Sequence, residues 1–390
     1  MKTTKVICIL VLGVILISTS CQRNEEVVPA QLDQENQQNG LDKSEMSLQL
    51  SQLLQNHANL SATIPLLQEN KRGVELRDVL ENMEEQNEEG QSFNRLQQMI
   101  EDAENQFQNI KSPKRIEVPE VWLHEPSASF ELEDLLIAFA PKGNERDWDK
   151  ITAYNLKQEV VYLDINQAPN RPVLVVETDG FEALKIKVDR INQRLQEHGL
   201  QKESLRKGRQ GNLEINNALE TTVLDAISLA DNKEPWIKGA SEVYAVTSGI
   251  RAEGDDKEAQ INVIAMQYLD NQGETYYPNQ VVLFWDDYDY QAANIQLFEQ
   301  DSNYNYEELV TILVEGVFTI TGILTELPWL SALGEIAGAI IEAMPDDFWT
   351  DDDDYIDSFY TIQKDRSYNN LLGAGKNATI SLSPLTIEGN

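Results

Sequence analysis

The chain has 390 residues, with 66 acidic against 31 basic side chains and a formal net charge of -35 at pH 7. Such acidity argues against a nucleic-acid partner, because phosphate contacts need a basic surface. It fits an extracytoplasmic protein that attracts divalent cations, and the length suggests two or three domains.

Residues 1–20 are typical of a bacterial lipoprotein signal peptide. A positively charged start is followed by the apolar stretch Val6–Ser18, which is too short for a comfortable membrane span. The sequence "STSC" then places Cys21 where a lipoprotein signal peptidase would cut and lipidate the chain. The alternative is an ordinary secretory signal with an incidental cysteine. Because Gln22 follows Cys21, we expect a lipid-anchored protein of the outer membrane or cell surface.

The cysteine count limits the chemistry of the mature chain. The only cysteine besides Cys21 is Cys8, which lies inside the signal. We therefore expect no disulfide, no cysteine nucleophile and no thiolate metal site. Residues 21–45 are rich in Gln, Asn and charge and have almost no apolar period, which predicts a flexible tether.

Residues 46–115 have the apolar spacing of helices. Three amphipathic stripes predict three short helices that must bury their apolar sides against each other or against the next part of the chain. The stripes are Leu48, Leu50, Leu53 and Leu54, then Val74, Leu76, Val79, Leu80 and Met83, then Phe93, Leu96, Met99, Ile100, Ala103 and Phe107.

Within residues 116–182 the period changes to two, which indicates strands. Five short runs bounded by turn residues predict a small β-domain: "VWLHEP", "LEDLLIAFAP", "KITAYN", "EVVYLDIN" and "PVLVVETDG". Residues 183–235 begin with a charged stretch of helical period and are interpreted as a helical connector.

Residues 236–390 predict an antiparallel β-sandwich. Its strand-like runs are "EVYAVTSGI", "QINVIAMQYL", "NQVVLFW", "ANIQLFEQD", "IDSFYTI" and "ATISLSPLTI". The expected fold class is therefore α+β, with an N-terminal helical region, a small β-domain and a C-terminal antiparallel β-sandwich that carries an inserted helical hairpin.

The inserted hairpin is Leu309–Met344, the most apolar block after the signal. Pro328 divides it into two halves, and four carboxylates interrupt it: Glu315, Glu326, Glu335 and Glu342. An unpaired carboxylate at bilayer depth costs several kcal/mol, which favours a buried hairpin over a membrane-inserting one.

Catalytic signatures are weak. The histidines are His57, His124 and His198, in three separate regions, and the sequence holds no HExxH, no GxSxG and no glycine-rich phosphate loop. His124 follows a strand-like run, and we interpret it as a structural histidine. The alternative is a metal ligand. With 66 acidic residues, the sequence selects no carboxylate pair for glycoside hydrolysis.

Calcium is better supported than catalysis. A hard cation takes oxygens from closely spaced carboxylates, amides and carbonyls. Two segments, "DSNYN" and "DDDDYID", offer such oxygens, although neither completes an EF-hand. The predicted metal ligands are Asp301, Asn303, Asn305, Asp351, Asp353, Asp354 and Asp357. The alternative is a pair of solvated turns in an acidic protein.

Three stretches carry a resemblance: "YYPNQVVLFWDDYDYQAANIQLFEQDSNYNYEELV", "DDDDYIDSFYTI" and "NNLLGAGKNATISLSP". Together they resemble an uncharacterised family of bacterial secreted or lipid-anchored proteins, a domain of unknown function. The likeness covers most of the chain after residue 110. The resemblance implies that the protein is secreted or anchored by lipid. Since the family has no established activity, the resemblance identifies no catalytic residue.

We therefore expect an acidic cell-envelope lipoprotein that acts as a non-catalytic binding or structural module, stabilised by calcium. Its membrane contact is the N-terminal lipid, and its ligand is a protein or a glycan. The alternative is a carboxylate-based hydrolase of surface glycans or peptides, and a third hypothesis is membrane insertion through the hairpin.

Overall fold

The chain divides into residues 1–40 and residues 41–390, and all of the described residues belong to the second part. The predicted signal peptide and Cys21 lie outside the described residues, as does most of the tether. The computed structural model describes residues 41–86, 93–109, 116–126, 131–143, 147–201, 218–231, 235–239, 243–253, 256–269, 273–299, 306–344 and 355–388.

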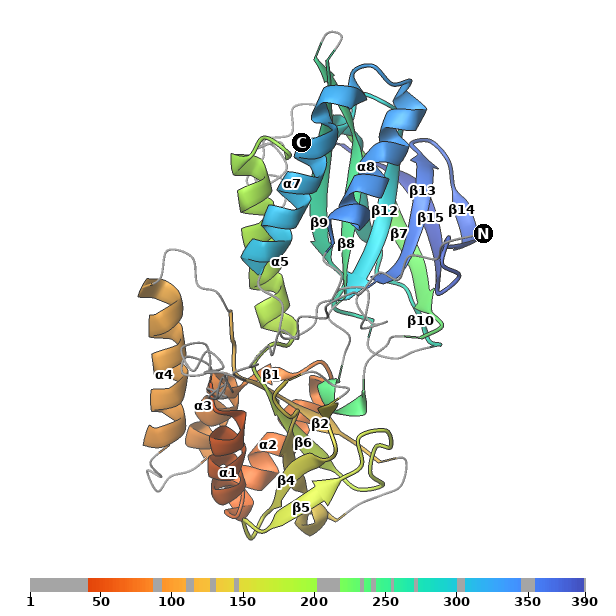
Figure 1. The fold of residues 1–390 in the computed structure, drawn as a ribbon. Coiled ribbons are helices and arrows are strands. Elements are labelled where there is room, and N and C mark those ends of the chain that lie inside the picture. Colours follow the sequence, from red (N-terminus) through yellow and green to blue (C-terminus); the bar gives the residue numbers. More distant parts are fainter. Residues whose placement is uncertain are drawn as a thin grey trace, which may run out of the picture. The chain divides into compact units, whose positions relative to one another are not determined.

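The N-terminal sheet has the strand order β1-β2-β6-β3-β4-β5 (Figure 1). Its pairs are antiparallel except β3 with β6, which is parallel. The strands are β1 (Val74–Glu75), β2 (Glu120–His124), β3 (Leu136–Phe139), β4 (Ile151–Asn155), β5 (Val160–Leu163) and β6 (Val173–Glu177). The five expected strands are thus confirmed as β2 to β6.

Helices cover one face of this sheet, and the two regions share one apolar core. The helices are α1 (Lys43–Leu53), α2 (His57–Glu69), α3 (Leu76–Gln86) and α4 (Asn94–Asn109). Leu50, Leu80 and Leu96 are buried in one cluster with Val121 and Val176 of the strands. Most of the described side chains of the predicted stripes therefore pack against the sheet as well as against each other.

Helix α2 was not predicted from the sequence. Its inward face mixes apolar residues with buried Asn59 and Thr63, and Pro65 lies inside it. The Thr63 hydroxyl donates to the Asn59 carbonyl at 2.8 Å, so the polar groups are satisfied locally. Because polar residues occupy part of the buried face, the apolar period is incomplete and the helical pattern is hidden.

The C-terminal part is the expected antiparallel sandwich, made of a five-stranded and a four-stranded sheet. The first contains β7 (Leu219–Leu229), β10 (Thr275–Tyr276), β11 (Gln280–Phe284), β14 (Tyr368–Leu372) and β15 (Ala378–Ile387). The second contains β8 (Val243–Glu253), β9 (Asp256–Ala265), β12 (Ala292–Glu299) and β13 (Tyr355–Gln363). One apolar cluster with residues from both sheets fills the space between them.

The interpretation of residues 183–235 as a helical connector is half right. Helix α5 (Phe181–Glu197) confirms its first part, but Leu219–Leu229 is strand β7, paired with β15 over most of its length. Glu220 and Asp225 interrupt its alternation, so the segment lacked a clear strand signal. The sandwich therefore begins at Leu219. Conversely, Trp236 and Ile237, placed in the sandwich by the sequence, pack against the N-terminal sheet.

Helix α5 is attached at both ends. Its first turn lies beside β2, where Glu182 N donates to the Glu120 carboxylate at 3.2 Å. Further along, Asn192 pairs with both backbone groups of Val263 on edge strand β9, at 2.7 and 2.9 Å. An edge strand whose N–H and C=O groups are occupied in this way is protected from pairing with another chain.

The inserted hairpin is confirmed as α7 (Tyr306–Leu324) and α8 (Trp329–Ala343), between β12 and β13. With α5 it covers the outer face of the four-stranded sheet (Figure 1). Asn294 and Gln296 of β12 donate to carbonyls of α8 at 2.9 and 3.3 Å. Burial is confined to one side of the hairpin, however. Among the described helices, none combines the length and apolar character that a bilayer span requires.

Candidate functional site

Of the predicted calcium ligands, the structure describes only Asp357. Asp301, Asn303, Asn305, Asp351, Asp353 and Asp354 lie outside the described residues. Across the part of the chain that is described, no group of three or more His, Cys, Asp or Glu side chains is arranged to hold a metal ion. The calcium site therefore stays a prediction for residues 301–305 and 351–354.

Asp357 is fully buried in β13, and backbone N–H groups surround its carboxylate. Oδ1 accepts from Ser358 N at 2.8 Å and Gly375 N at 2.6 Å. Oδ2 accepts from Asn377 N at 2.8 Å and Ala378 N at 2.7 Å. These four bonds use the four lone-pair positions of a carboxylate. Asp357 thus joins β13 to the turn before β15.

That turn contains the sequence "GAGKN", residues 373–377. A β-carbon at Gly373 would overlap the Asp357 carboxylate, so the backbone can approach the acid only because residue 373 lacks a side chain. Lys376 N donates to Gly373 O at 3.1 Å and closes the turn.

A second group of charges lies where β2, β6, α1 and α5 meet. We call it the charged junction. Backbone contacts hold its elements together: Val118 N donates to Thr178 O at 2.8 Å and Leu76 N to Pro119 O at 2.8 Å. Its members are Lys43, Glu117, Glu120, Glu177, Asp179 and Lys187.

Glu120 is the most perturbed acid of the charged junction. It is 1% exposed and lies opposite Glu177 in the β2–β6 register. Burial raises the pKa of its carboxyl from 4.5 to about 8, with smaller increases from Glu182, Glu75 and Asp179. The bond from Glu182 N lowers it only in part. Glu120 is therefore largely protonated at neutral pH.

The charged junction also contains two lysines, Lys187 and Lys43. Lys187 is 3% exposed and forms an ion pair with Asp179. Burial lowers the pKa of the Lys43 ammonium, against the opposing effect of Asp179, Glu177 and Glu117. A β-carbon at Gly180 would lie 2.5 Å from Glu177 Oε1 and 2.8 Å from Glu120 Oε2. A side chain at residue 180 would therefore displace the Glu177 or Glu120 carboxyl group from the start of α5.

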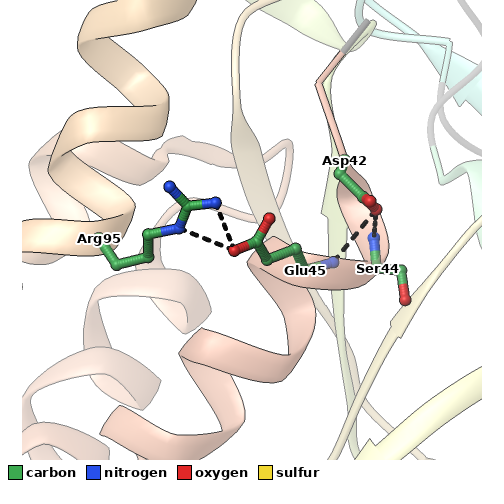
Figure 2. A network of polar contacts seen from close by, with 4 residues as sticks. All are labelled: Asp42, Ser44, Glu45 and Arg95. Atoms are coloured by element: carbon green, nitrogen blue, oxygen red, sulfur yellow. Dashed lines mark hydrogen bonds and ion pairs between the residues drawn. The ribbon is translucent and has the colours of Figure 1, made fainter. Parts of the chain in front are cut away.

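The start of α1, which carries Lys43, is fixed by the network in Figure 2. Asp42 accepts from Ser44 N at 3.0 Å and Glu45 N at 3.2 Å, as a helix N-cap does. Glu45 in turn pairs with Arg95 of α4 at 2.6 and 2.7 Å. These contacts fix the first turn of α1, which presents Lys43 to the junction.

The charged junction could not be found in the sequence, because acids are too common in this chain to select a pair. The available signal was local: Glu120 lies between Pro119 and the apolar residues "VWL". Chemically, a neutral carboxyl beside Glu177 resembles an acid–base pair. Yet the Glu120 side chain is almost wholly buried, and its hydrogen bond with Glu182 N joins β2 to α5.

The histidines occupy structural or exposed positions. His124 Nε2 lies 3.1 Å from Pro169 O, and its ring is 5.4 Å from that of Trp236. This setting matches the structural interpretation of His124. His57 contacts Ser61 on the exposed side of α2, and His198 ends α5.

The third feature is an exposed apolar area on the α7–α8 hairpin, which we call the hairpin surface. Its side chains belong to the last two turns of α7 and the start of α8, on either side of the connecting turn. They are Phe318, Ile323, Trp329 and Leu330, with Gly322 and Gly334 beside them. Several large apolar side chains exposed on either side of one turn are typical of an interaction site.

Together, these features define an α+β protein in which helices cover one face of a mixed sheet and one face of an antiparallel sandwich. The chain belongs to a family of proteins of unknown function, DUF3103, which matches residues 43–390. Comparisons with curated proteins and with solved structures gave no match.

Proposed function

We propose that this protein is a non-catalytic binding module of the bacterial cell envelope, anchored by lipid on Cys21. The observation that supports binding is the hairpin surface, where Phe318 is 67% and Leu330 52% exposed. An isolated exposed leucine is ordinary, but four large apolar side chains around one turn favour a partner.

Site-specific photo-crosslinking in cells tests the binding role. A photoreactive residue at Trp329 should give a discrete adduct with an envelope component. The control position is Tyr277, which is 73% exposed and belongs to another part of the sandwich. Equal adducts at both positions, or none at Trp329, would contradict a binding role for the hairpin surface.

The anchor is tested separately by fractionation. Cys21→Ser should move the protein from the membrane to the soluble fraction and abolish labelling with a fatty-acid analogue. A variant that still sediments with membranes and remains labelled would refute lipidation of Cys21.

Calcium is proposed as a stabilising ion at residues 301–305 and 351–354, and not at Asp357, whose acceptor positions are occupied. The support is the alternation of oxygen-bearing side chains at Asp301, Asn303 and Asn305 and the excess of acidic residues.

A hydrolase is the second candidate, favoured by the raised pKa of Glu120 beside Glu177. Its test is a screen of the purified mature chain against chromogenic glycosides and peptides. Turnover that disappears in Glu120→Gln while the variant stays folded would replace the binding proposal.

A further inference from the structure

The hairpin surface is rigid as well as apolar. Trp329 stacks on Tyr290, with ring centroids 5.6 Å apart and planes at 13°. Lys257 of β9 donates to the carbonyls of Thr325 and Leu327 at 2.9 and 2.7 Å, which holds the connecting turn. A partner would therefore meet a preformed surface and would not have to order it, which favours affinity.

Its glycines leave room for a close approach. A β-carbon at Gly316 would lie 2.6 Å from Ala343 Cβ, so this glycine serves the packing of α7 on α8. Beside Gly322, Gly334 and Gly338, by contrast, a β-carbon would meet nothing within 4 Å. Glycine inside a helix is destabilising relative to alanine, and nothing within the described fold uses these three. They allow another backbone to come near.

The hairpin itself carries charges of one sign, and the Lys257 ammonium beside it is bound to the carbonyls of Thr325 and Leu327. Tyr306–Met344 contains no Lys, Arg or His. Four exposed carboxylates lie on the hairpin, three on its helices and Glu326 in the connecting turn, and among the described residues none of them has an ion pair: Glu315, Glu326, Glu335 and Glu342. Helical spacing places Glu335 and Glu342 on the same side of α8 as Gly334 and Gly338.

This combination decides among three occupants. A bilayer is disfavoured, since the carboxylates would have to approach hydrocarbon. A second copy is disfavoured because a two-fold contact would bring like charges together. An amphipathic helix with an apolar stripe and basic flanks matches both the apolar residues and the carboxylates, and its stripe can lie over the glycines.

We infer that the hairpin surface binds a basic amphipathic helix of a partner protein. The inference rests on the proposed binding function and specifies the class of ligand. Apolar side chains of the partner would lie against Phe318, Trp329 and Leu330. Its Lys or Arg side chains would pair with Glu335 and Glu342.

The test uses a synthetic Leu/Lys peptide of about 18 residues, ~27 Å long as a helix, which is close to the length of α7. The mature chain should bind it, and should bind a scrambled peptide of the same charge much more weakly. Glu335→Lys with Glu342→Lys should weaken binding about tenfold, and the loss should shrink at high salt. Glu81→Lys with Glu101→Lys, on α3 and α4, is the matched control and should change it little.

Gly334→Leu adds a side chain where the fold has space, so it should abolish peptide binding without lowering the Tm. Equal binding of the scrambled peptide, equal loss in the control variant, or unchanged binding by Gly334→Leu would overturn the inference. So would binding to neutral or anionic phospholipid vesicles in place of the peptide, or concentration-dependent self-association that Gly334→Leu abolishes. A crosslink at Trp329 without peptide binding would leave the binding function and reject only this ligand class.

Discussion

Asp357→Asn is the sharpest perturbation that the structure offers. The carboxylate accepts four backbone N–H groups, at 2.6 to 2.8 Å, from its own neighbour Ser358 and from three positions between the last turn and the start of β15. The asparagine amide keeps one oxygen, which can accept two of these bonds. Its NH2 group would then face the two remaining N–H donors.

The expected cost follows from those two positions. A hydrogen bond to a charged group contributes about 1.5–3 kcal/mol, and a buried donor left without an acceptor costs a similar amount. Two lost bonds therefore remove ~3–6 kcal/mol from the free energy of unfolding, a large part of the ~5–15 kcal/mol of a typical protein. Asp357→Ala leaves all four N–H donors without the carboxylate and should lower the free energy of unfolding further.

Urea denaturation followed by circular dichroism measures this loss. The matched control is Asp365→Asn, an exposed aspartate in the turn after β13. We expect the control to stay within about 0.5 kcal/mol of the wild type. If Asp357→Asn also stayed within about 1 kcal/mol of the wild type, the four-bond anchor would be refuted.

Three further predictions concern buried groups. The folded Glu120 carboxyl retains a proton that the unfolded one releases, because its pKa is raised from 4.5 to about 8. Its contribution to the free energy of unfolding is therefore fully present below pH 4.5 and is lost as the pH rises toward about 8. Glu120→Gln should therefore match the wild type near pH 5 and exceed its free energy of unfolding by ~2–4 kcal/mol at pH 9; identical pH profiles would contradict this. Gly316→Val should lower the free energy of unfolding by ~1–3 kcal/mol, since its β-carbon meets Ala343 at 2.6 Å, whereas Gly334→Ala in open space should raise it by up to ~1 kcal/mol. Lys257→Met should lower it by ~2 kcal/mol through loss of the bonds to Thr325 and Leu327, and an unchanged urea midpoint would show that solvent replaces them.

Elements with a complete periodic pattern could be predicted from the sequence. Strands β2 to β6 are short runs rich in apolar residues and bounded by turn residues, and the hairpin is an apolar block divided by Pro328. Helix α2 and strand β7 were missed because polar residues enter their buried faces, Asn59 in the first and Thr222 in the second. Asn59 donates a hydrogen bond to the Leu53 carbonyl, and Thr222 accepts one from the Trp285 indole. Such bonds satisfy buried polar groups but produce no periodic pattern in the sequence.

The roles of Asp357 and Glu120 could not be predicted from the sequence for a related reason. Asp357 looked like one more member of an acidic run, yet its partners are backbone N–H groups 18 to 21 residues away. Glu120 obtains its raised pKa from burial against α5, which begins about sixty residues later. A side chain whose partners are backbone atoms of distant residues has no signature in spacing, since any residue type except proline can supply an N–H.

The predicted calcium ion and the predicted peptide can be tested as one system. Residues 301–305 and 351–354 flank the hairpin in the sequence, so an ion that holds both segments would fix the two ends of α7–α8. Binding to the folded state alone would stabilise it by about 2.7 kcal/mol at a hundredfold excess over Kd. A chelator should then lower the Tm, and Asp301→Asn with Asp353→Asn should remove that sensitivity. If calcium and the peptide both bind best to the same arrangement of the hairpin, calcium should tighten binding of the Leu/Lys peptide, and the peptide must tighten calcium binding by the same factor. Melting curves that are identical with calcium and with chelator would leave the acidic segments as solvated turns.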